Sequence, residues 1–494
     1  MNRARPVQID WKPDKSGAEP VYRQIVAFVL DKVSSGEWPV GTRLPPQRQL
    51  AEQFGVNRST VTTAIEELTS YGMLAGGHGA GTQVISNTWS LLLPPAPDWD
   101  RYVSSGFFRA NSETIQTINR LEFEPGILRL GTGELDPRLF PREIWADVLG
   151  RLSSAVTSLG YLEPLGLPQL REAIAARMAA LGIRTTPSCI LITSGSLQAL
   201  HLISACLLQS GSTVFVEAPS YLKSLQIFQS AGMRLSGVPM GPEGMCFEEI
   251  GAHASLKKQR IPSIVYTIPT NHNPTGITMT GSRRRALMEF CEVNRLPIIE
   301  DGAYQELCFQ GPGWEPLKAL DRNGMVLYLG SVSKSFAPGL RIGWVVAPEP
   351  IVQRLGDVKM QMDYGGSSVS QWILTELFTS GMYDEYLDTL RPELLRRRDH
   401  ALAVLDRHYW DIATWNVPQG GFYIWLTLRE DVRVDRVFQE AIRAKILLNP
   451  GDIYDFQGNH ALRLSYSYTT CEEFETAAVE LAGMIRRLSG RGKN

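Results

Sequence analysis

The segment MVLYLGSVSKSFAPGLRIGWVVAP, residues 325–348, decides the fold of the larger part of the chain. It contains two apolar runs, MVLYLGS (325–331) and IGWVVAP (342–348), and the connection between them carries Lys334 and Arg341. A continuous apolar run of this length indicates a strand that is buried on both faces of a sheet. Polar residues that directly follow such a strand lie at the edge of the sheet where α/β proteins bind their ligands.

Four earlier segments repeat this pattern of a largely apolar run bounded by glycine, proline, asparagine or serine. They are CILIT (189–193), TVFVEAP (213–219), SIVYTIP (263–269) and LPIIED (296–301). Helical stretches, such as residues 197–209 and 282–294, lie between them. Apolar strands that alternate with helices predict a mostly parallel sheet covered on both faces. We therefore expect a large α/β domain over residues 126–494.

Small or polar residues stand at the end of most of these strands. They are Ser194, Gly195 and Ser196 after the first run, Asn273 after the third, Asp301 and Tyr304 at the fourth, and Ser331, Ser333, Lys334 and Arg341 at the fifth. Taken alone, the first turn is equally well explained as a helix N-cap, and Lys334 as a solvated surface lysine. Together they supply a lysine for an imine, an acid for a pyridinium nitrogen, and donors for a phenolic oxygen and a phosphate. This combination predicts a site for pyridoxal 5′-phosphate, held by Lys334 as a Schiff base.

The bulk composition excludes several classes of protein. The chain has 494 residues, a formal net charge of −2 and six cysteines, none of them in a CxxC pair. The length predicts two or more domains, and the charge argues against bulk coating of nucleic acid or membrane. The cysteine spacing suggests no zinc site, so no metal is expected. The N-terminus lacks a signal-peptide pattern and the apolar stretches are too short for a bilayer, so we expect a cytoplasmic protein without a membrane partner.

The motifs SGSLQAL, NPTG, the Asp-x-x-Tyr turn and SxSKxxxPGLRIGW resemble those of the class I and II aminotransferases of PLP fold type I, from about residue 128 to the C-terminus. The resemblance implies that Lys334 forms the internal aldimine, that Asp301 pairs with the pyridinium nitrogen, and that Asn273 and Tyr304 hydrogen-bond the 3′-oxygen. Lys334, Asp301 and Tyr304 are thus the expected catalytic residues. The other cofactor-binding residues implied are Ser196, Ser331, Ser333 and Arg341 at the phosphate, Ser194 and Gly195 in the same turn, and Tyr221 stacked on the ring.

Two further residues match positions of this family outside the strand ends. Tyr161 resembles the tyrosine that reaches a phosphate across a dimer interface, although it can also be a packing residue beside a helix. Arg463, in LRLSYS, resembles the arginine that clamps an α-carboxylate in a bidentate fork. A surface arginine is less favoured because Leu462 and Leu464 flank it. If Arg463 has this role, the bound molecule is an amino acid or a similar carboxylate.

Residues 1–85 have a different pattern, and residues 86–125 are expected to link them to the large domain. Helical periodicity covers residues 20–38, and two shorter helices, Pro46 to Phe54 and Arg58 to Tyr71, flank a tight turn at Gly55. Two strand-like runs around a glycine-rich tip follow at residues 73–85. Helix, short turn and helix followed by such a hairpin predict a winged helix-turn-helix, a small α/β domain that binds double-stranded DNA. A helical module for protein contacts is the less favoured alternative.

The segment GTRLPPQRQLAEQFGVNRSTVTTAIEELTSYGML resembles the GntR family of winged-helix regulators over residues 18–85. The resemblance implies DNA contacts by Arg43, Arg48, Arg58, Ser59 and Thr60, and by the wing around Gly79 near the minor groove. Thr62 belongs to the same exposed start of the third helix, whose short polar side chains suit phosphate and base-edge contacts. The sequence departs from the family at LPPQR, where a serine is more usual and would cap the helix.

A GntR-type reader joined to an aminotransferase-type domain resembles the MocR subfamily of bacterial regulators. The resemblance implies a transcriptional regulator that binds pyridoxal phosphate and senses an amino acid or other amino compound by forming an external aldimine. It also implies a homodimer in which the reader of one chain packs on the large domain of the other, so that two readers reach two operator half-sites. The competing hypothesis is a genuine aminotransferase with an accessory DNA-binding module, because every group needed for transamination is present in the sequence.

Overall fold

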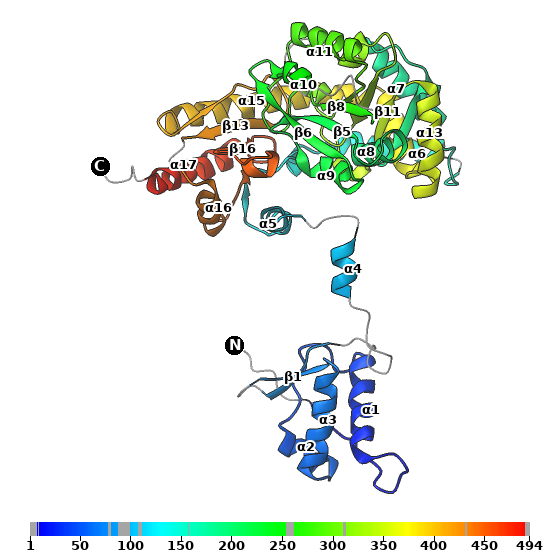
Figure 1. Cartoon of the computed structure of the whole chain (residues 1–494), viewed down its shortest axis with the longest axis vertical. Coiled ribbons are helices and arrows are strands. Elements are labelled where there is room, and N and C mark those ends of the chain that lie inside the picture. Colours follow the sequence, from blue (N-terminus) through cyan, green and yellow to red (C-terminus); the bar gives the residue numbers. More distant parts are fainter. Residues whose placement is uncertain are drawn as a thin grey trace. The chain divides into compact units, whose positions relative to one another are not determined.

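The computed structural model describes residues 7, 9–77, 81–86, 99–106, 111–156, 158–252, 261–309, 313–429 and 432–489 (Figure 1). The chain divides into two compact units, Met1–Gly106 and Phe107–Asn494. Two helices lie in the interval 86–125, where the sequence predicts a linker: α4 (Trp99–Ser105) and α5 (Glu113–Leu121). Among the described residues, no helix combines the length and the apolar character that a bilayer-spanning segment needs.

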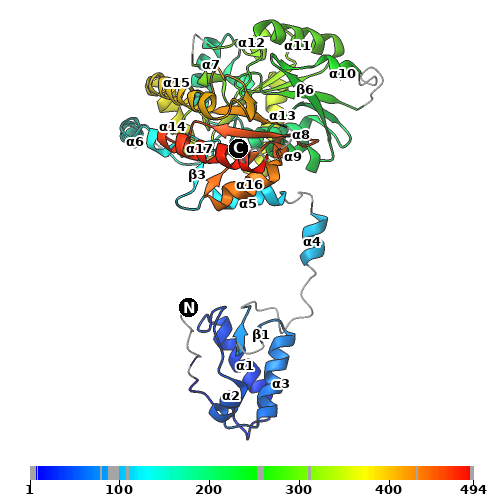
Figure 2. The same cartoon turned by 90° about the vertical axis from the view of Figure 1, so that its left-hand side faces the viewer.

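In the described residues up to 86, the small unit contains three helices and a hairpin, and α4 lies further along the same unit. The helices are α1 (Val21–Ser34), α2 (Gln47–Phe54) and α3 (Arg58–Ser70), and strand β1 (Leu74–Gly77) pairs antiparallel with β2 (Gly81–Val84). Helices α1 and α3 lie side by side in both views (Figures 1 and 2). The hairpin is where the sequence places the wing, but its tip at Gly79 lies outside the described residues.

The helix pattern of the small unit follows from which side chains it buries. Apolar residues at helical spacing, among them Ile25, Val29, Val61 and Leu68, form one core that the hairpin joins. Helix α2 ends at Gly55, whose φ of 66° is the left-handed conformation that glycine adopts without strain. The glycine thus makes the sharp turn that the helix-turn-helix arrangement requires.

The large unit contains an eight-stranded sheet in the order β4-β11-β10-β9-β8-β5-β6-β7. The strands are β4 (Ile190–Thr193), β5 (Thr213–Ala218), β6 (Arg234–Gly241), β7 (Gly244–Met245), β8 (Ser263–Thr267), β9 (Ile298–Asp301), β10 (Val326–Ser331) and β11 (Gly343–Val346). All neighbours from β10 to β6 pair in parallel, whereas β11 is antiparallel to both β10 and β4. The sheet is therefore mostly parallel, as the sequence predicts.

Helices connect these strands and pack against the sheet (Figure 1). They are α6 (Arg142–Ala155), α7 (Pro168–Ala180), α8 (Ser196–Leu207), α9 (Leu222–Ser230), α10 (Glu248–Ala252), α11 (Gly281–Asn294), α12 (Leu317–Leu320), α13 (Glu349–Met362) and α14 (Ser368–Thr379). Helices α7, α8 and α13 all contact β4. Strands β4, β9 and β10 are fully buried, which explains why their sequences are largely apolar.

The C-terminal part of the large unit has a core of its own. Strands β12 (Ala413–Trp415), β13 (Tyr423–Leu428), β15 (Asn449–Pro450) and β16 (Ala461–Ser465) form an antiparallel sheet, and β3 (Leu128–Arg129) pairs with β14 (Ile446–Leu447). The helices here are α15 (Met382–His408), α16 (Val434–Arg443) and α17 (Cys471–Leu488). Ile118 and Leu121 of α5 belong to this core. Helix α5 is therefore packed into the large unit rather than extended from it.

Candidate cofactor and effector site

The ends of neighbouring strands bring the predicted residues to one edge of the large sheet. Asp301 is the last residue of β9 and Ser331 the last residue of β10, and these two strands pair in parallel. Because β11 runs in the opposite direction, Arg341, which precedes it, lies at this same edge. Ser196 begins helix α8 directly after β4, and Asn273 follows β8. Residues far apart in the sequence thus meet where a ligand is expected.

A pocket of about 320 Å³ opens at this edge. Its lining includes most of the predicted cofactor residues: Gly195, Ser196, Tyr221, Asn273, Asp301, Tyr304, Ser331, Ser333, Lys334 and Arg341. The volume lies within the range of about 300–1,000 Å³ that is usual for small-molecule sites. The chemistry of the lining therefore decides which ligand fits.

Asp301 and Lys334 are the acid and the amine in the lining of this pocket. The Nζ atom of Lys334 donates to the carbonyl oxygen of Gly133 at 2.7 Å. Asp301 is buried, accepts from the hydroxyl of Tyr266 at 2.7 Å and from the backbone of Ala303 at 3.1 Å. Burial raises the pKa of Asp301 above its ordinary value. Among the described residues no cation forms an ion pair with it, so a ligand N–H with positive charge would meet an unpaired buried carboxylate.

Gly195, Ser196 and Arg341 form the part of the pocket lining that can receive an anion. Helix α8 begins after Gly195, and no side chain of the described residues caps its first turn. The φ of Gly195 is 89°, a conformation that strains residues with a Cβ, and a Cβ added there would lie 2.8 Å from Nη2 of Arg341. Arg341 donates to the carbonyl oxygens of Ser194 at 3.0 Å and Pro338 at 3.4 Å and forms no ion pair within the described ranges. A free cation at a helix N-terminus suits a phosphate.

Two predicted cofactor residues do not line the pocket of a single chain. The hydroxyl of Ser194 lies 3.4 Å from Asp363, and its carbonyl group rather than its hydroxyl faces Arg341. Tyr161 is 86 % exposed and packs edge-on against the ring of Tyr364, with 5.1 Å between the ring centroids. Tyr161 therefore lies outside the lining of this pocket.

A second pocket of about 170 Å³ adjoins the first and shares Tyr221, Asn273 and Lys334 with it. Arg463, on strand β16, lines this second pocket although it is only 4 % exposed. Its guanidinium donates to Oδ1 of Asn273 at 2.8 Å and to the carbonyl oxygen of Gly131 at 2.6 Å, while its Nε has no partner. No carboxylate of the described residues pairs with this charge. A buried cation without a counterion is costly, so an anionic ligand would stabilise it.

Aromatic side chains enclose this arginine. Its Cζ atom lies 4.2 Å from the ring centroid of Tyr423 and 4.9 Å from that of Tyr454, and both rings are buried. Burial raises the pKa of Tyr221, at the junction of the two pockets, to about 12. Helix α5 closes the second pocket with Ile115 and Ile118. The lining of this pocket thus combines apolar and aromatic side chains with the charged residues Arg463, Lys334, Lys223, Glu122 and Glu134.

Three residues of the site have no role in the sequence-based prediction. Tyr266 lies in SIVYTIP, which the sequence predicts as a strand, and Tyr423 lies in strand β13. Gly133 contacts Lys334 and lies against the hydroxyl of Tyr423, where an added Cβ would come within 2.3 Å. In the sequence, a tyrosine within a strand is the only sign of these roles, and it does not show which group its hydroxyl contacts.

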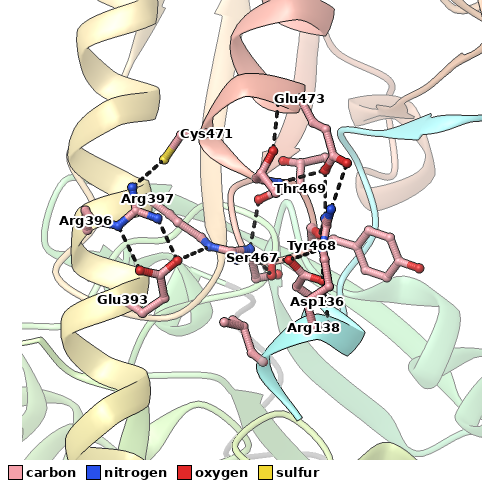
Figure 3. Close-up of polar contacts among 12 residues, drawn as sticks. Asp136, Arg138, Glu393, Arg396, Arg397, Ser467, Tyr468, Thr469, Cys471 and Glu473 are labelled. Carbon is pink, nitrogen blue, oxygen red and sulfur yellow. Dashed lines mark hydrogen bonds and ion pairs between the residues drawn. The ribbon is translucent and has the colours of Figure 1, made fainter.

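A network of charges fixes the loop that carries Gly131 and Gly133 (Figure 3). Buried Asp136 pairs with Arg397 of α15 at 2.9 Å, and Arg397 also donates to the carbonyl oxygens of Ser467 and Thr469 after β16. The remaining pairs are Arg138–Asp136 at 2.7 Å, Arg138–Glu473 at 2.8 Å, Arg397–Glu393 at 2.7 Å and Arg396–Glu393 at 2.8 Å. Hydrogen bonds from the arginines lower the pKa of Glu393 and of Glu473 to about 2. The network thereby ties the loop to the strand of Arg463.

The predicted DNA-contacting residues of the small unit lie mostly on its surface. Arg58 and Ser59 at the start of α3 are exposed, and so is Arg48 of α2, which lies 3.7 Å from Glu52. Thr60 and Thr62 are half-buried, with the Thr62 hydroxyl 3.1 Å from Oε1 of Gln47. Arg43 is half-buried, and its backbone forms an isolated antiparallel β-bridge with Gln83 of β2.

Helix α2 begins after Pro46, and no side chain of the described residues caps its first turn. Pro46 takes the N-cap position where the GntR resemblance expects a serine, so the amide groups of this turn face outward without a capping hydroxyl. Neither α2 nor α3 has a side-chain cap on the backbone N–H groups of its first turn. Each of these first turns also carries an exposed arginine, Arg48 in α2 and Arg58 in α3.

Comparison with known families gives two matches, one for each unit. Residues 125–481 match the family described as aminotransferase class I and II. Residues 21–84 match the bacterial regulatory proteins of the gntR family. The two matches confirm the predicted fold class, a winged helix-turn-helix followed by a large domain of PLP fold type I.

Two relatives along most of the chain are named as regulators, whereas a similar solved structure is an enzyme. The HTH-type transcriptional regulator YisV of Bacillus subtilis is 48 % identical over 97 % of this chain and 98 % of its own length. NorG, an HTH-type transcriptional regulator of Staphylococcus aureus, is 32 % identical over 90 % of this chain and its full length. The kynurenine aminotransferase of Pyrococcus horikoshii, solved in complex with PMP, is 30 % identical with a TM-score of 0.74 and covers 79 % of this chain and 98 % of its own.

Proposed function

The chain belongs to the family of HTH-type transcriptional regulators that join a gntR-family domain to a class I and II aminotransferase domain, and from this premise we propose that it senses an amino carboxylate through pyridoxal phosphate. The observation that carries the proposal is the joined pocket, in which Lys334 and the unpaired, buried Arg463 face one space. Pyridoxal phosphate, when bound, would supply a carbon that forms an imine with an amine. Lys334 would hold the cofactor through that carbon, and the amine of the effector would compete with Lys334 for it.

The residues of the site have separate tasks in this proposal. Arg341 and the start of α8 would hold the phosphate, and Asp301 would keep the pyridine nitrogen protonated. Arg463 would bind the carboxylate of the effector in a bidentate fork and so set its distance from Lys334. Asn273, which accepts from Arg463, and Tyr304 would donate to the phenolic oxygen.

We propose a homodimer, because apolar residues beside the cofactor pocket are exposed in the single chain. Leu197 lines the pocket and is 51 % exposed, and Tyr161 and Tyr364 are 86 % and 58 % exposed. Gln198 joins this helix to Asp363 by a hydrogen bond of 2.6 Å, so these residues form one neighbourhood. A second copy that covers it would bring a Tyr161 to each phosphate, and exchange of readers between chains would place two readers on two half-sites.

We further propose that the small unit reads operator DNA in the cytoplasm with the starts of α2 and α3. Arg48 and Arg58 are exposed cations that suit phosphates, and Ser59 and Thr60 can reach base edges. Arg43 beside the hairpin would assist the wing. Most of these contacts would go to the backbone and fix the register of the reader.

The test uses the full-length protein loaded with pyridoxal phosphate. Wild type should absorb in the visible, borohydride should fix the cofactor to the peptide that contains Lys334, and Lys334→Ala should lose both signals. A label on Lys223, the other lysine that lines the pocket, would contradict the assignment. Amino acids and amines are then screened for spectral shifts. Rapid multiple turnover with a keto acid would instead favour the aminotransferase, which the complete set of lysine, aspartate and arginine residues also permits.

A further inference from the structure

Tyr423 lines the pocket of Arg463 and contacts Tyr304, which lines the adjoining cofactor pocket. Neither its sequence context nor the proposed function gives it a role. It belongs to β13 and is 1 % exposed. Its hydroxyl lies 2.8 Å from the hydroxyl of Tyr304, and its ring lies under the guanidinium of Arg463. One side chain thus contacts both the expected donor to the cofactor oxygen and the expected carboxylate clamp.

The backbone around Tyr423 is built closely onto its hydroxyl. A Cβ at Gly133 would come within 2.3 Å of that oxygen, so a residue larger than glycine would displace it. The carbonyl oxygen of the same Gly133 accepts from Lys334. The hydroxyl of Tyr423 therefore packs against Gly133 and lies 2.8 Å from the hydroxyl of Tyr304.

The number of hydrogen atoms determines what this pair of hydroxyls can do. A tyrosine hydroxyl donates one hydrogen and accepts others. If Tyr423 donates to Tyr304, the single hydrogen of Tyr304 is left for a ligand, and donation along the chain strengthens it. The amide of Asn273 also approaches the Tyr304 hydroxyl, at 3.4 Å, which is too long for a strong bond. Tyr423 is thus the better-placed partner of that hydroxyl.

We propose that Tyr423 is a positioning residue whose hydroxyl orients the Tyr304 hydroxyl toward the 3′-oxygen of pyridoxal phosphate. The inference rests on the proposed function, because it requires the cofactor in this pocket. A hydrogen bond donated to that oxygen favours the form with more negative charge on it. Loss of the orientation should therefore move the pH midpoint of the visible absorbance change to higher values.

The experiment compares full-length, cofactor-loaded wild type with Tyr423→Phe, Tyr304→Phe and the double variant. Tyr423→Phe keeps the ring under Arg463 and removes only the hydroxyl. We expect its midpoint to rise by roughly half to one pH unit, the size of one net hydrogen bond. If Tyr423 acts through Tyr304, adding Tyr423→Phe to Tyr304→Phe should cause no further shift.

The control is Tyr409→Phe, another buried tyrosine whose hydroxyl is bonded, here to the carbonyl oxygen of Ala478 at 2.6 Å in the C-terminal core. It should leave the midpoint where wild type has it. A midpoint unchanged in Tyr423→Phe, or equal shifts added in the double variant, would overturn the inference. Wild type without any visible absorbance would instead refute cofactor binding itself, so the two failures are distinguishable.

Discussion

The site at the sheet edge and the surface of the reader use charge in opposite ways. Arg463 is 4 % exposed and Asp301 9 %, and neither forms an ion pair within the described part of the chain. Arg48 of the reader is 87 % exposed in its side chain, and its partner Glu52, 3.7 Å away, is 71 % exposed. Unpaired buried charges are expensive and call for one specific ligand. Solvated charges cost little and suit the repeated, salt-sensitive contacts of DNA.

The largest effect should come from removing the buried cation. Arg463→Gln leaves the carboxylate of an effector without its fork, so we expect affinity to fall by about 4 kcal/mol, or roughly a thousandfold. Spectral titration with the amino acid found in the screen measures it. Arg463→Lys is the matched control, because it keeps the charge and should lose less. Equal affinities for wild type and Arg463→Gln would show that the buried arginine does not bind the effector.

The next effect concerns stability and separates buried from exposed ion pairs. Arg397→Met removes the partner of buried Asp136 and the donor to two carbonyl groups (Figure 3). We expect a loss of about 3 kcal/mol, at the low end for a buried pair because Arg138 still contacts Asp136. Urea unfolding measures it.

Arg396→Met is the comparison variant, since Arg396 is 61 % exposed in its side chain and pairs with the same Glu393. It should cost less than about 1 kcal/mol. Equal losses of unfolding free energy in the two variants would contradict the distinction between buried and exposed ion pairs.

A smaller effect is expected at the reader. Arg58→Ala should weaken operator binding by about 1 kcal/mol and reduce the slope of log affinity against log salt by about 1. Fluorescence anisotropy at several salt concentrations checks both, with Arg433→Ala, an exposed arginine of the large unit paired with Asp435, as control. An unchanged slope would exclude a phosphate contact by Arg58.

A further effect is a pH dependence of the charge network. The pKa of Glu393 and of Glu473 is about 2 in the folded chain, below the ordinary value of 4.5. Their contribution is therefore present above pH 4.5 and is lost as the pH falls toward 2. The urea midpoint should decrease over that range, and Glu393→Gln should flatten part of the decrease. The same decrease in the variant would assign it to other carboxylates.

The sequence predicts the parts of the site that depend on one strand and the turn after it. Lys334, Asp301 and Asn273 each follow an apolar run, and a parallel sheet brings such turns together whatever the details of packing. The strand positions follow for the same reason, because burial on both faces requires a continuously apolar sequence.

Contacts between distant segments could not be predicted in this way. The hydroxyl pair of Tyr304 and Tyr423 joins segments 119 residues apart, and an aromatic residue in a strand reads as core whether or not its hydroxyl has a partner. Helix α5 lies in an interval where the sequence predicts a linker. The helix has nine residues and buries three apolar side chains, and so short a pattern does not reveal which core it joins. Tertiary packing decides such elements.

The central claim is that the large unit senses an amino carboxylate on behalf of the reader. The most direct measurement titrates the effector from the spectral screen into wild type with and without operator DNA. If the two sites are coupled, effector affinity should differ by about 5–150-fold, or ~1–3 kcal/mol, and operator affinity should change by the same factor when effector is added. Equal effector affinities with and without operator, together with rapid turnover with a keto acid, would contradict the account.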